Sequence, residues 1–121
     1  MAYLVVCIVD NPDHCPPILE AWENIGIYGV TILESTGLGR LRRAGLRDDL
    51  PLMPSLRDLF EGGEVHHRTL FSVVEEQSMV DQMVDVVHQI LGNLDRGRTG
   101  FLFVVPVLQV YGLGKNYRSL P

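Results

Sequence analysis

The chain has 121 residues, of which 46% are hydrophobic, and its formal net charge is −5 at pH 7. This length suits a single domain, taken here as residues 1–121, and the hydrophobic content is too high for a disordered chain. The acidic balance argues against a general nucleic-acid binder, because neutralising phosphates requires an excess of Lys and Arg.

Features of a membrane or secreted protein are not expected in this chain. The apolar runs YLVVCIV and GFLFVVPVL are much shorter than the roughly 20 residues that a membrane-spanning helix needs. The N-terminal residues lack the basic region and cleavage site of a signal peptide, so we expect a cytoplasmic protein with no membrane span. Cys7 and Cys15 match no metal-binding spacing, and we expect reduced thiols, no metal and no cofactor.

The apolar pattern predicts four strands and two helices. Residues 2–9 form an apolar strand, and a turn-rich stretch then leads into a helix from Pro17 to Ile25 that ends at Gly26. Residues 27–35 and 68–75 are the next two strands. A wide apolar stripe predicts a helix that opens at Ser78 and ends at Leu91, followed by a strand over residues 101–113 that is interrupted at Pro106.

A long charged excursion separates the second and third strands, from Gly37 to about residue 64. A connection longer than about 15 residues is uncommon in a compact domain and is often functional. Residues 55–63 are expected to form one or two helical turns within it. Four arginines near its start could form a local anion site or meet an acidic partner: Arg40, Arg42, Arg43 and Arg47.

The order β-α-β-loop-β-α-β is that of the ferredoxin-like fold, an α+β architecture with a four-stranded antiparallel sheet. Two helices cover one face of such a sheet, yet the strands are apolar on both faces. The second face therefore needs another cover, and association through the sheet provides it. We expect a homo-oligomer with closed symmetry, and a homotrimer brings three sheets around one axis.

Three stretches resemble the PII nitrogen-regulatory proteins. AWENIGIYGVTILESTGLGR is similar to their first helix, second strand and entry to the T-loop. FSVVEEQSMVDQMVDVVHQIL is similar to their third strand and second helix, and TGFLFVVPVLQVYGL to their B-loop and last strand. The resemblance implies a trimeric, non-enzymatic signalling protein of a divergent branch. It also implies a T-loop-like segment, residues 40–64, and a C-terminal tail, residues 114–121.

The resemblance further implies that an adenine nucleotide binds in the clefts between subunits. Residues 40–64 would then report occupancy to a partner protein, such as a transporter or an enzyme. Gly37 and Gly39 can take positive φ and leave room for a phosphate, while Arg40 provides a planar cation. The residues expected to bind the nucleotide are Gly29, Val30, Thr31, Gly37, Leu38, Gly39, Arg40, Arg98, Thr99 and Gly100.

The chain departs from the family pattern at several basic positions. Phe101 stands where the family usually has a phosphate-binding lysine, and Gly112 and Gly114 fall near two family arginines. This loss of positive charge favours AMP, ADP or a cyclic nucleotide over ATP. No tyrosine lies between Arg40 and Arg68, so the family's tyrosine modification is not expected.

Two other functions fit the same elements. One is a structural or interaction module with a permanently folded loop and no nucleotide. The other is an ACT-type amino-acid-binding regulatory domain, which shares the element order and would not need Arg40. An enzyme is not expected, because Ser35 and Ser72 lie in predicted strands without an assignable His and Asp. His66 and His67 are adjacent in a strand and point to opposite faces, which argues against one shared metal ion.

Overall fold

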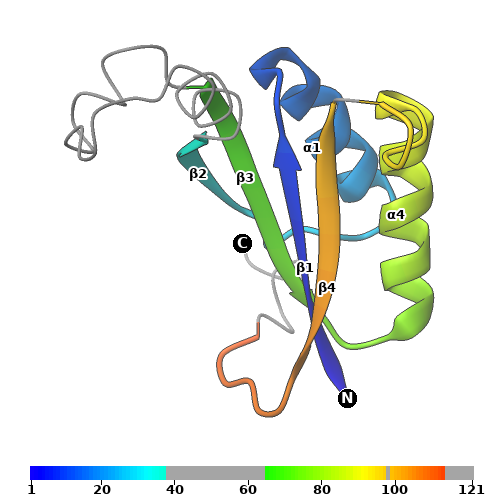
Figure 1. The fold of residues 1–121 in the computed structure, drawn as a ribbon. Helices are drawn as coiled ribbons and strands as arrows, with labels where there is room; N and C mark the ends of the chain where they lie inside the picture. The colour runs from blue at the N-terminus through cyan, green and yellow to red at the C-terminus, as the bar shows by residue number, and fades with distance from the viewer. Residues whose placement is uncertain (38–64, 98, 114–121) are drawn as a thin grey trace, which may run out of the picture.

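The computed structural model describes residues 1–37, 65–97 and 99–113. In chain order it contains strand β1 (Ala2–Val9), the 3-10 helix η1 (Pro12–His14), helix α1 (Cys15–Asn24), strands β2 (Thr31–Gly37) and β3 (Val65–Val74), helix α4 (Gln77–Leu91) and strand β4 (Gly100–Val107) (Figure 1). The expected α+β fold with four strands and two α-helices is confirmed. The predictions for the T-loop-like segment 40–64, the helical turns in 55–63 and the tail 114–121 lie outside the described residues.

The four strands form one antiparallel sheet in the order β2-β3-β1-β4. β1 therefore lies in the interior of the sheet and pairs with a neighbouring strand along each of its two edges. β2 and β4 are the two edge strands. Both α-helices lie on the same side of the sheet (Figure 1), and no helix in the described part of the chain is long and apolar enough to cross a membrane.

The hydrophobic core lies between the helices and the sheet face that they cover. Trp22 of α1 is fully buried, and its indole nitrogen donates a hydrogen bond to the main-chain oxygen of Met83 in α4, 3.2 Å away. This contact joins the two helices within the core. The other fully buried side chains are supplied by alternate residues of β1, by β3 and by the apolar stripes of the helices: Val5, Cys7, Val9, Ile18, Leu70, Met83 and Val87.

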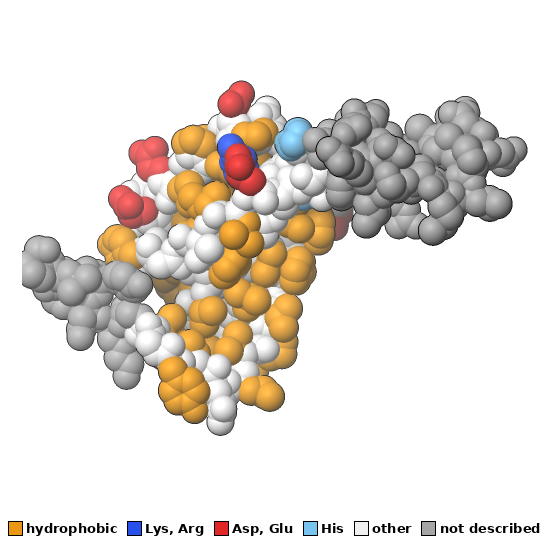
Figure 2. Space-filling model, turned by 90° about the vertical axis from the view of Figure 1, so that its left-hand side faces the viewer, with side chains coloured by type: hydrophobic (Ala, Val, Ile, Leu, Met, Phe, Trp, Pro, Cys, Tyr) orange, Lys and Arg blue, Asp and Glu red, His pale blue; other side chains and the backbone are white. Residues whose placement is uncertain are grey.

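The other face of the sheet, called here the open face, is not covered by any helix or strand among the described residues. Its side chains alternate with those of the core face and are aligned by the strand register. Several are large and exposed, including Leu33 at 51% and Phe101 at 53%. Hydrophobic side chains gather on the side of the molecule that carries β2, and charged ones are few there (Figure 2). The open face consists of Ala2, Leu4, Val6, Ile8, Thr31, Leu33, Ser35, Gly37, His67, Thr69, Phe71, Val73, Phe101, Phe103, Val105 and Val107.

The strand boundaries differ from the expected ones: β3 runs from Val65 to Val74 and not over 68–75, and the largest differences are in β2 and β4. β2 begins at Thr31, not at residue 27, because the carbonyl oxygen of Gly29 accepts a hydrogen bond from the Ser72 hydroxyl (2.6 Å) outside the strand ladder. β4 continues through Pro106, because an edge strand tolerates a residue that cannot donate a ladder hydrogen bond. β4 then ends at Val107, well before residue 113.

The helix starts also differ from the expected ones. α1 begins at Cys15, two residues before Pro17, because Pro16 and Pro17 occupy its first turn, where a missing N–H costs nothing. The predicted start at Ser78 was wrong: α4 begins at Gln77, and Glu76 precedes it without a side-chain cap. The Ser78 hydroxyl instead makes a long contact of 3.4 Å with the Glu76 carboxylate.

Candidate functional site

The structure places the predicted nucleotide-binding residues in two groups. Gly29 and Val30 lead into β2, Thr31 begins it, and Gly37 ends it. Thr99 and Gly100 lie at the start of β4. The remaining members of the predicted set, Leu38, Gly39, Arg40 and Arg98, lie outside the described residues.

These two groups lie on opposite edges of the sheet. β2 and β4 are separated by β3 and β1, and three inter-strand steps of roughly 4.8 Å place the edges about 14 Å apart. Within one chain the two groups are not neighbours. A ligand shorter than this separation cannot contact both groups within one chain.

The group at β4 is held against the end of β1. The main-chain nitrogen of Asp10 donates to the carbonyl oxygen of Thr99 (2.9 Å). Gly100 has φ 154°, and a Cβ atom added to it would overlap the carbonyl oxygen of Ile8. The Thr99 hydroxyl donates weakly to the carbonyl oxygen of Leu91 at the end of α4, at 3.4 Å. Glycine at position 100 thus allows the turn to approach the sheet closely.

The β2 group is anchored at its beginning by a buried hydroxyl. Ser72 is only 4% exposed, and its Oγ donates to the Gly29 carbonyl oxygen at 2.6 Å. This hydrogen bond sets the path of the chain just before Thr31. Val30 packs against the core, whereas Thr31 is exposed on the open face.

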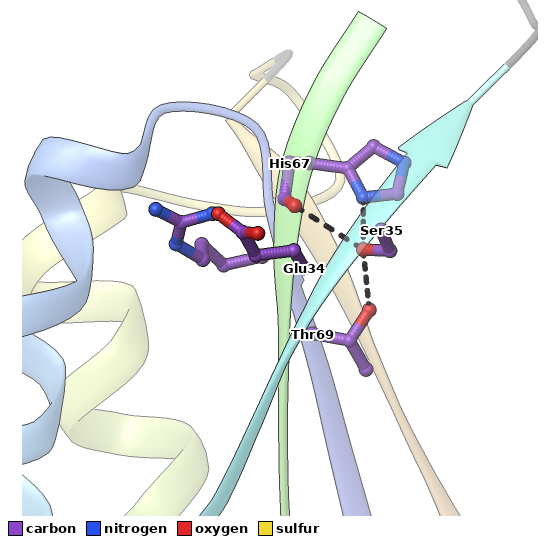
Figure 3. Close-up of polar contacts among 5 residues, drawn as sticks. Glu34, Ser35, His67 and Thr69 are labelled. Carbon is purple, nitrogen blue, oxygen red and sulfur yellow. Dashed lines mark hydrogen bonds and ion pairs between the residues drawn. The ribbon is translucent and has the colours of Figure 1, made fainter.

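A polar cluster lies near the C-terminal end of β2. It is formed by Ser35 of β2 and by His67 and Thr69 of the neighbouring strand β3. The Ser35 Oγ lies 2.5 Å from His67 Nδ1, 2.8 Å from Thr69 Oγ1 and 3.3 Å from the His67 carbonyl oxygen (Figure 3). The ring also packs on Gly37, where an added Cβ would lie 2.9 Å from His67 Nε2. The imidazole is therefore held between Ser35 and the backbone of the residue that ends β2.

This cluster was not found from the sequence, in which Ser35 had no assignable histidine. The β2–β3 register brings Ser35 opposite His67, so a correct pairing of the two strands would have been the signal. The third member, Thr69, contacts Ser35 and not the imidazole. Among the described residues, no carboxylate takes the place of the acid that orients histidine in hydrolytic triads.

The opposite face of the same strands carries an ion pair. Arg68 Nη1 lies 2.6 Å from Glu34 Oε1, on the other side of β2 from Ser35 (Figure 3). The Glu34 side chain is 82% exposed, so this pair stabilises the fold only slightly. Burial raises the pKa of the nearby Cys15 thiol, and the positive charge of Arg68 partly opposes that rise.

Neither histidine of the adjacent pair belongs to a metal centre in the described chain. His66 pairs with Thr36 and His67 with Ser35 along the ladder, so their side chains lie on opposite faces, as the alternation of a strand requires. No group of three His, Cys, Asp or Glu side chains suited to a metal ion occurs among residues 1–37, 65–97 and 99–113.

A pocket of about 460 Å³ lies at the end of the sheet away from Gly37. It is bounded by Met1, by Glu75 and by residues 107–113, including Gly112. Its described lining holds one carboxylate and no Lys or Arg side chain. A polyphosphate is therefore poorly matched to this part of the surface.

Comparison with known proteins identifies the family. The family described as "Nitrogen regulatory protein P-II" matches residues 3–116. The crystal structure of Arabidopsis thaliana PII bound to citrate is similar in fold, with a TM-score of 0.60 and 24% sequence identity over 88% of this chain and 77% of that one. No curated protein matches the chain. Because the family match spans nearly the whole chain, this protein belongs to the nitrogen regulatory protein P-II family.

Proposed function

We propose that the chain is a non-enzymatic signalling regulator that binds a small effector, an adenine nucleotide, in clefts between identical subunits. Residues 40–64 would report the occupied state to a partner protein, a transporter or an enzyme. The observation that carries this proposal is the position of the predicted site residues on opposite edges of one sheet. Membership of the P-II family supports the regulatory role.

The geometry favours a closed ring of copies. Joining the β2 edge of one chain to the β4 edge of the next is a head-to-tail contact, and such contacts close into rings when the rotation allows. In a ring of three, the open faces point toward the axis and cover one another. This arrangement would remove exposed side chains such as Leu33, Phe101 and Phe103 from water, which is the main driving force for such association.

The charge distribution favours a ligand with few phosphates. Gly37, Thr31, Thr99 and Gly100 offer backbone groups and hydroxyls, and the only cations in the predicted set are Arg40 and Arg98. AMP or ADP needs fewer positive partners than ATP does. The citrate in the Arabidopsis PII structure makes a small polycarboxylate the natural competitor to test.

Isothermal titration with AMP, ADP, ATP, cyclic AMP and citrate, with the mass determined by light scattering, tests the proposal. The expected result is a trimer that binds AMP or ADP at micromolar concentration. Arg40→Ala should weaken binding at least tenfold, whereas Arg43→Ala, a matched change in the same segment, should not. A trimer that binds none of the nucleotides would refute the effector assignment, and a monomer would refute the inter-subunit site.

A further inference from the structure

The open face contains a single titratable side chain among the described residues, and that side chain is His67. The remaining polar members of this face, Thr31, Ser35 and Thr69, do not ionise in the physiological range. Every other member is apolar or glycine. If a second copy covers this face, His67 is the group whose charge can change inside the contact.

The contacts of His67 allow its ring to carry either one or two protons. A neutral ring accepts a hydrogen bond at Nδ1 from the Ser35 hydroxyl, while Thr69 donates to Ser35 (2.8 Å). When Nδ1 is protonated it donates to Ser35 Oγ, and the Ser35 hydroxyl can turn toward the His67 carbonyl oxygen, 3.3 Å away. The cluster therefore keeps its geometry in both states, and protonation changes the charge more than the shape.

We propose that His67 makes the self-association of the open face dependent on pH, with the neutral imidazole permitting the contact and the imidazolium opposing it. The inference rests on the self-association proposed above and adds its regulation. The physical reason is that the described strand residues of the open face offer an imidazolium no counter-charge, so the charge would be removed from water without compensation from them.

The charged and titratable groups nearest to His67 come from β2, from β3 and from the end of β1. On β2 the nearest is Glu34, and on β3 they are Arg68 and His66; all three lie on the helix-covered face. On β1 the nearest is Asp10, which directly follows the last residue paired with β3. Among the described residues, Asp10 is the one acid placed to favour an imidazolium, so it must be varied in the test.

The pH dependence of association predicted from His67 is opposite to the one predicted from the overall charge of the chain. The chain carries a formal charge of −5 at pH 7, and its isoelectric point is about 5.2. Repulsion between copies therefore falls as the pH is lowered, and this effect alone would strengthen association. Protonation of His67 would weaken association over the same pH range, so the sign of the change in the association constant separates the two effects.

Sedimentation equilibrium of the full chain at about pH 8 and about pH 5.5, on either side of the range in which histidine changes charge, tests the inference. The association constant should fall by up to about tenfold for each covered His67 at the lower pH. His67→Asn keeps a polar atom near the Nδ1 position and should abolish the fall. His66→Asn, the adjacent residue on the opposite face, should retain it, and Asp10→Asn should retain or enlarge it.

The outcomes separate this inference from the proposed function. An oligomer whose association constant is unchanged or rises at the lower pH would overturn the role of His67 and leave the oligomeric site intact. A fall that persists in His67→Asn would also overturn it. A monomer at both pH values would overturn the self-association itself. Circular dichroism establishes that each variant is folded, and His67→Gln replaces the Asn variant if the latter does not fold.

Discussion

The main chain at Gly100 lies against the carbonyl oxygen of Ile8, so closely that a Cβ atom at position 100 would overlap that oxygen. Its φ of 154° is also unfavourable for a residue with a side chain. Gly100→Ala must therefore push β4 away from β1 at the turn that carries Thr99. We expect a loss of about 2–4 kcal/mol in the free energy of unfolding, measured by urea denaturation.

Gly97→Ala is the control for this change. It lies in the same turn, and its added Cβ would meet its nearest neighbour, the carbonyl oxygen of Asn93, at an ordinary 3.6 Å. Its cost should stay below about 1 kcal/mol. Equal losses in the two variants would show that the close approach of Gly100 to Ile8 does not determine the stability of this turn.

Removal of the Ser72 hydroxyl should lower both the stability of the fold and the affinity for the effector. Ser72→Ala leaves the Gly29 carbonyl oxygen without its 2.6 Å donor, and we expect a cost of about 1–2 kcal/mol. Because Gly29 leads into Thr31 and the proposed site, effector affinity should fall as well. Chemical denaturation and calorimetric titration measure the two effects. Ser78→Ala, which removes only a 3.4 Å surface contact, should change neither.

Much of the fold can be predicted from the sequence, because the apolar residues follow clear patterns in its helices and strands. The apolar stripe of α4 places Val80, Met83, Val87 and Leu91 in the core, as helical spacing predicts. The uniformly apolar pattern of β1 matches its position between two strands. The predicted bounds were wrong at the ends of helices and strands. There a single side-chain contact, such as that of Ser72 with Gly29, outweighs the secondary-structure propensity of the residues.

The site was less predictable, because it depends on which strands are neighbours. The residues expected to bind one ligand lie in two groups on opposite edges of the sheet. This separation follows from the strand order β2-β3-β1-β4. The Ser35–His67 contact similarly depends on a one-to-one register between segments 32 positions apart. A shift of one residue in that register would move His67 to the other face.

The packing of His67 on Gly37 should be measurable as a coupling between these residues. Gly37→Ala adds a Cβ that would lie 2.9 Å from Nε2, so the ring must move and its hydrogen bond to Ser35 must weaken. We expect Gly37→Ala to cost about 1 kcal/mol in the wild-type background and less when His67 is already alanine, giving a coupling energy of about 0.5–1 kcal/mol. Urea denaturation of the two single variants and the double variant completes the cycle. Strictly additive losses would argue against this contact.

The buried thiol of Cys7 should make the fold sensitive to alkali. Cys7 is fully buried, and burial, with a smaller contribution from Cys15, raises its pKa from 9.0 to about 12. Above pH 9 the unfolded chain loses this proton while the folded chain keeps it, so unfolding becomes progressively more favourable. The free energy of unfolding should therefore hold below pH 9 and fall between about pH 9 and 12, with a slope approaching about 1.4 kcal/mol per pH unit from this group.

Cys7→Ala isolates this contribution, because the tyrosines and the single lysine that also titrate in alkali are common to both proteins. The variant should be less stable than the wild type at neutral pH, since it leaves a small cavity. Its stability should nevertheless fall less steeply as the pH rises. Urea denaturation under reducing conditions at several alkaline pH values gives both curves. Parallel curves would mean that the Cys7 thiol does not hold its proton more tightly in the folded state than in the unfolded chain.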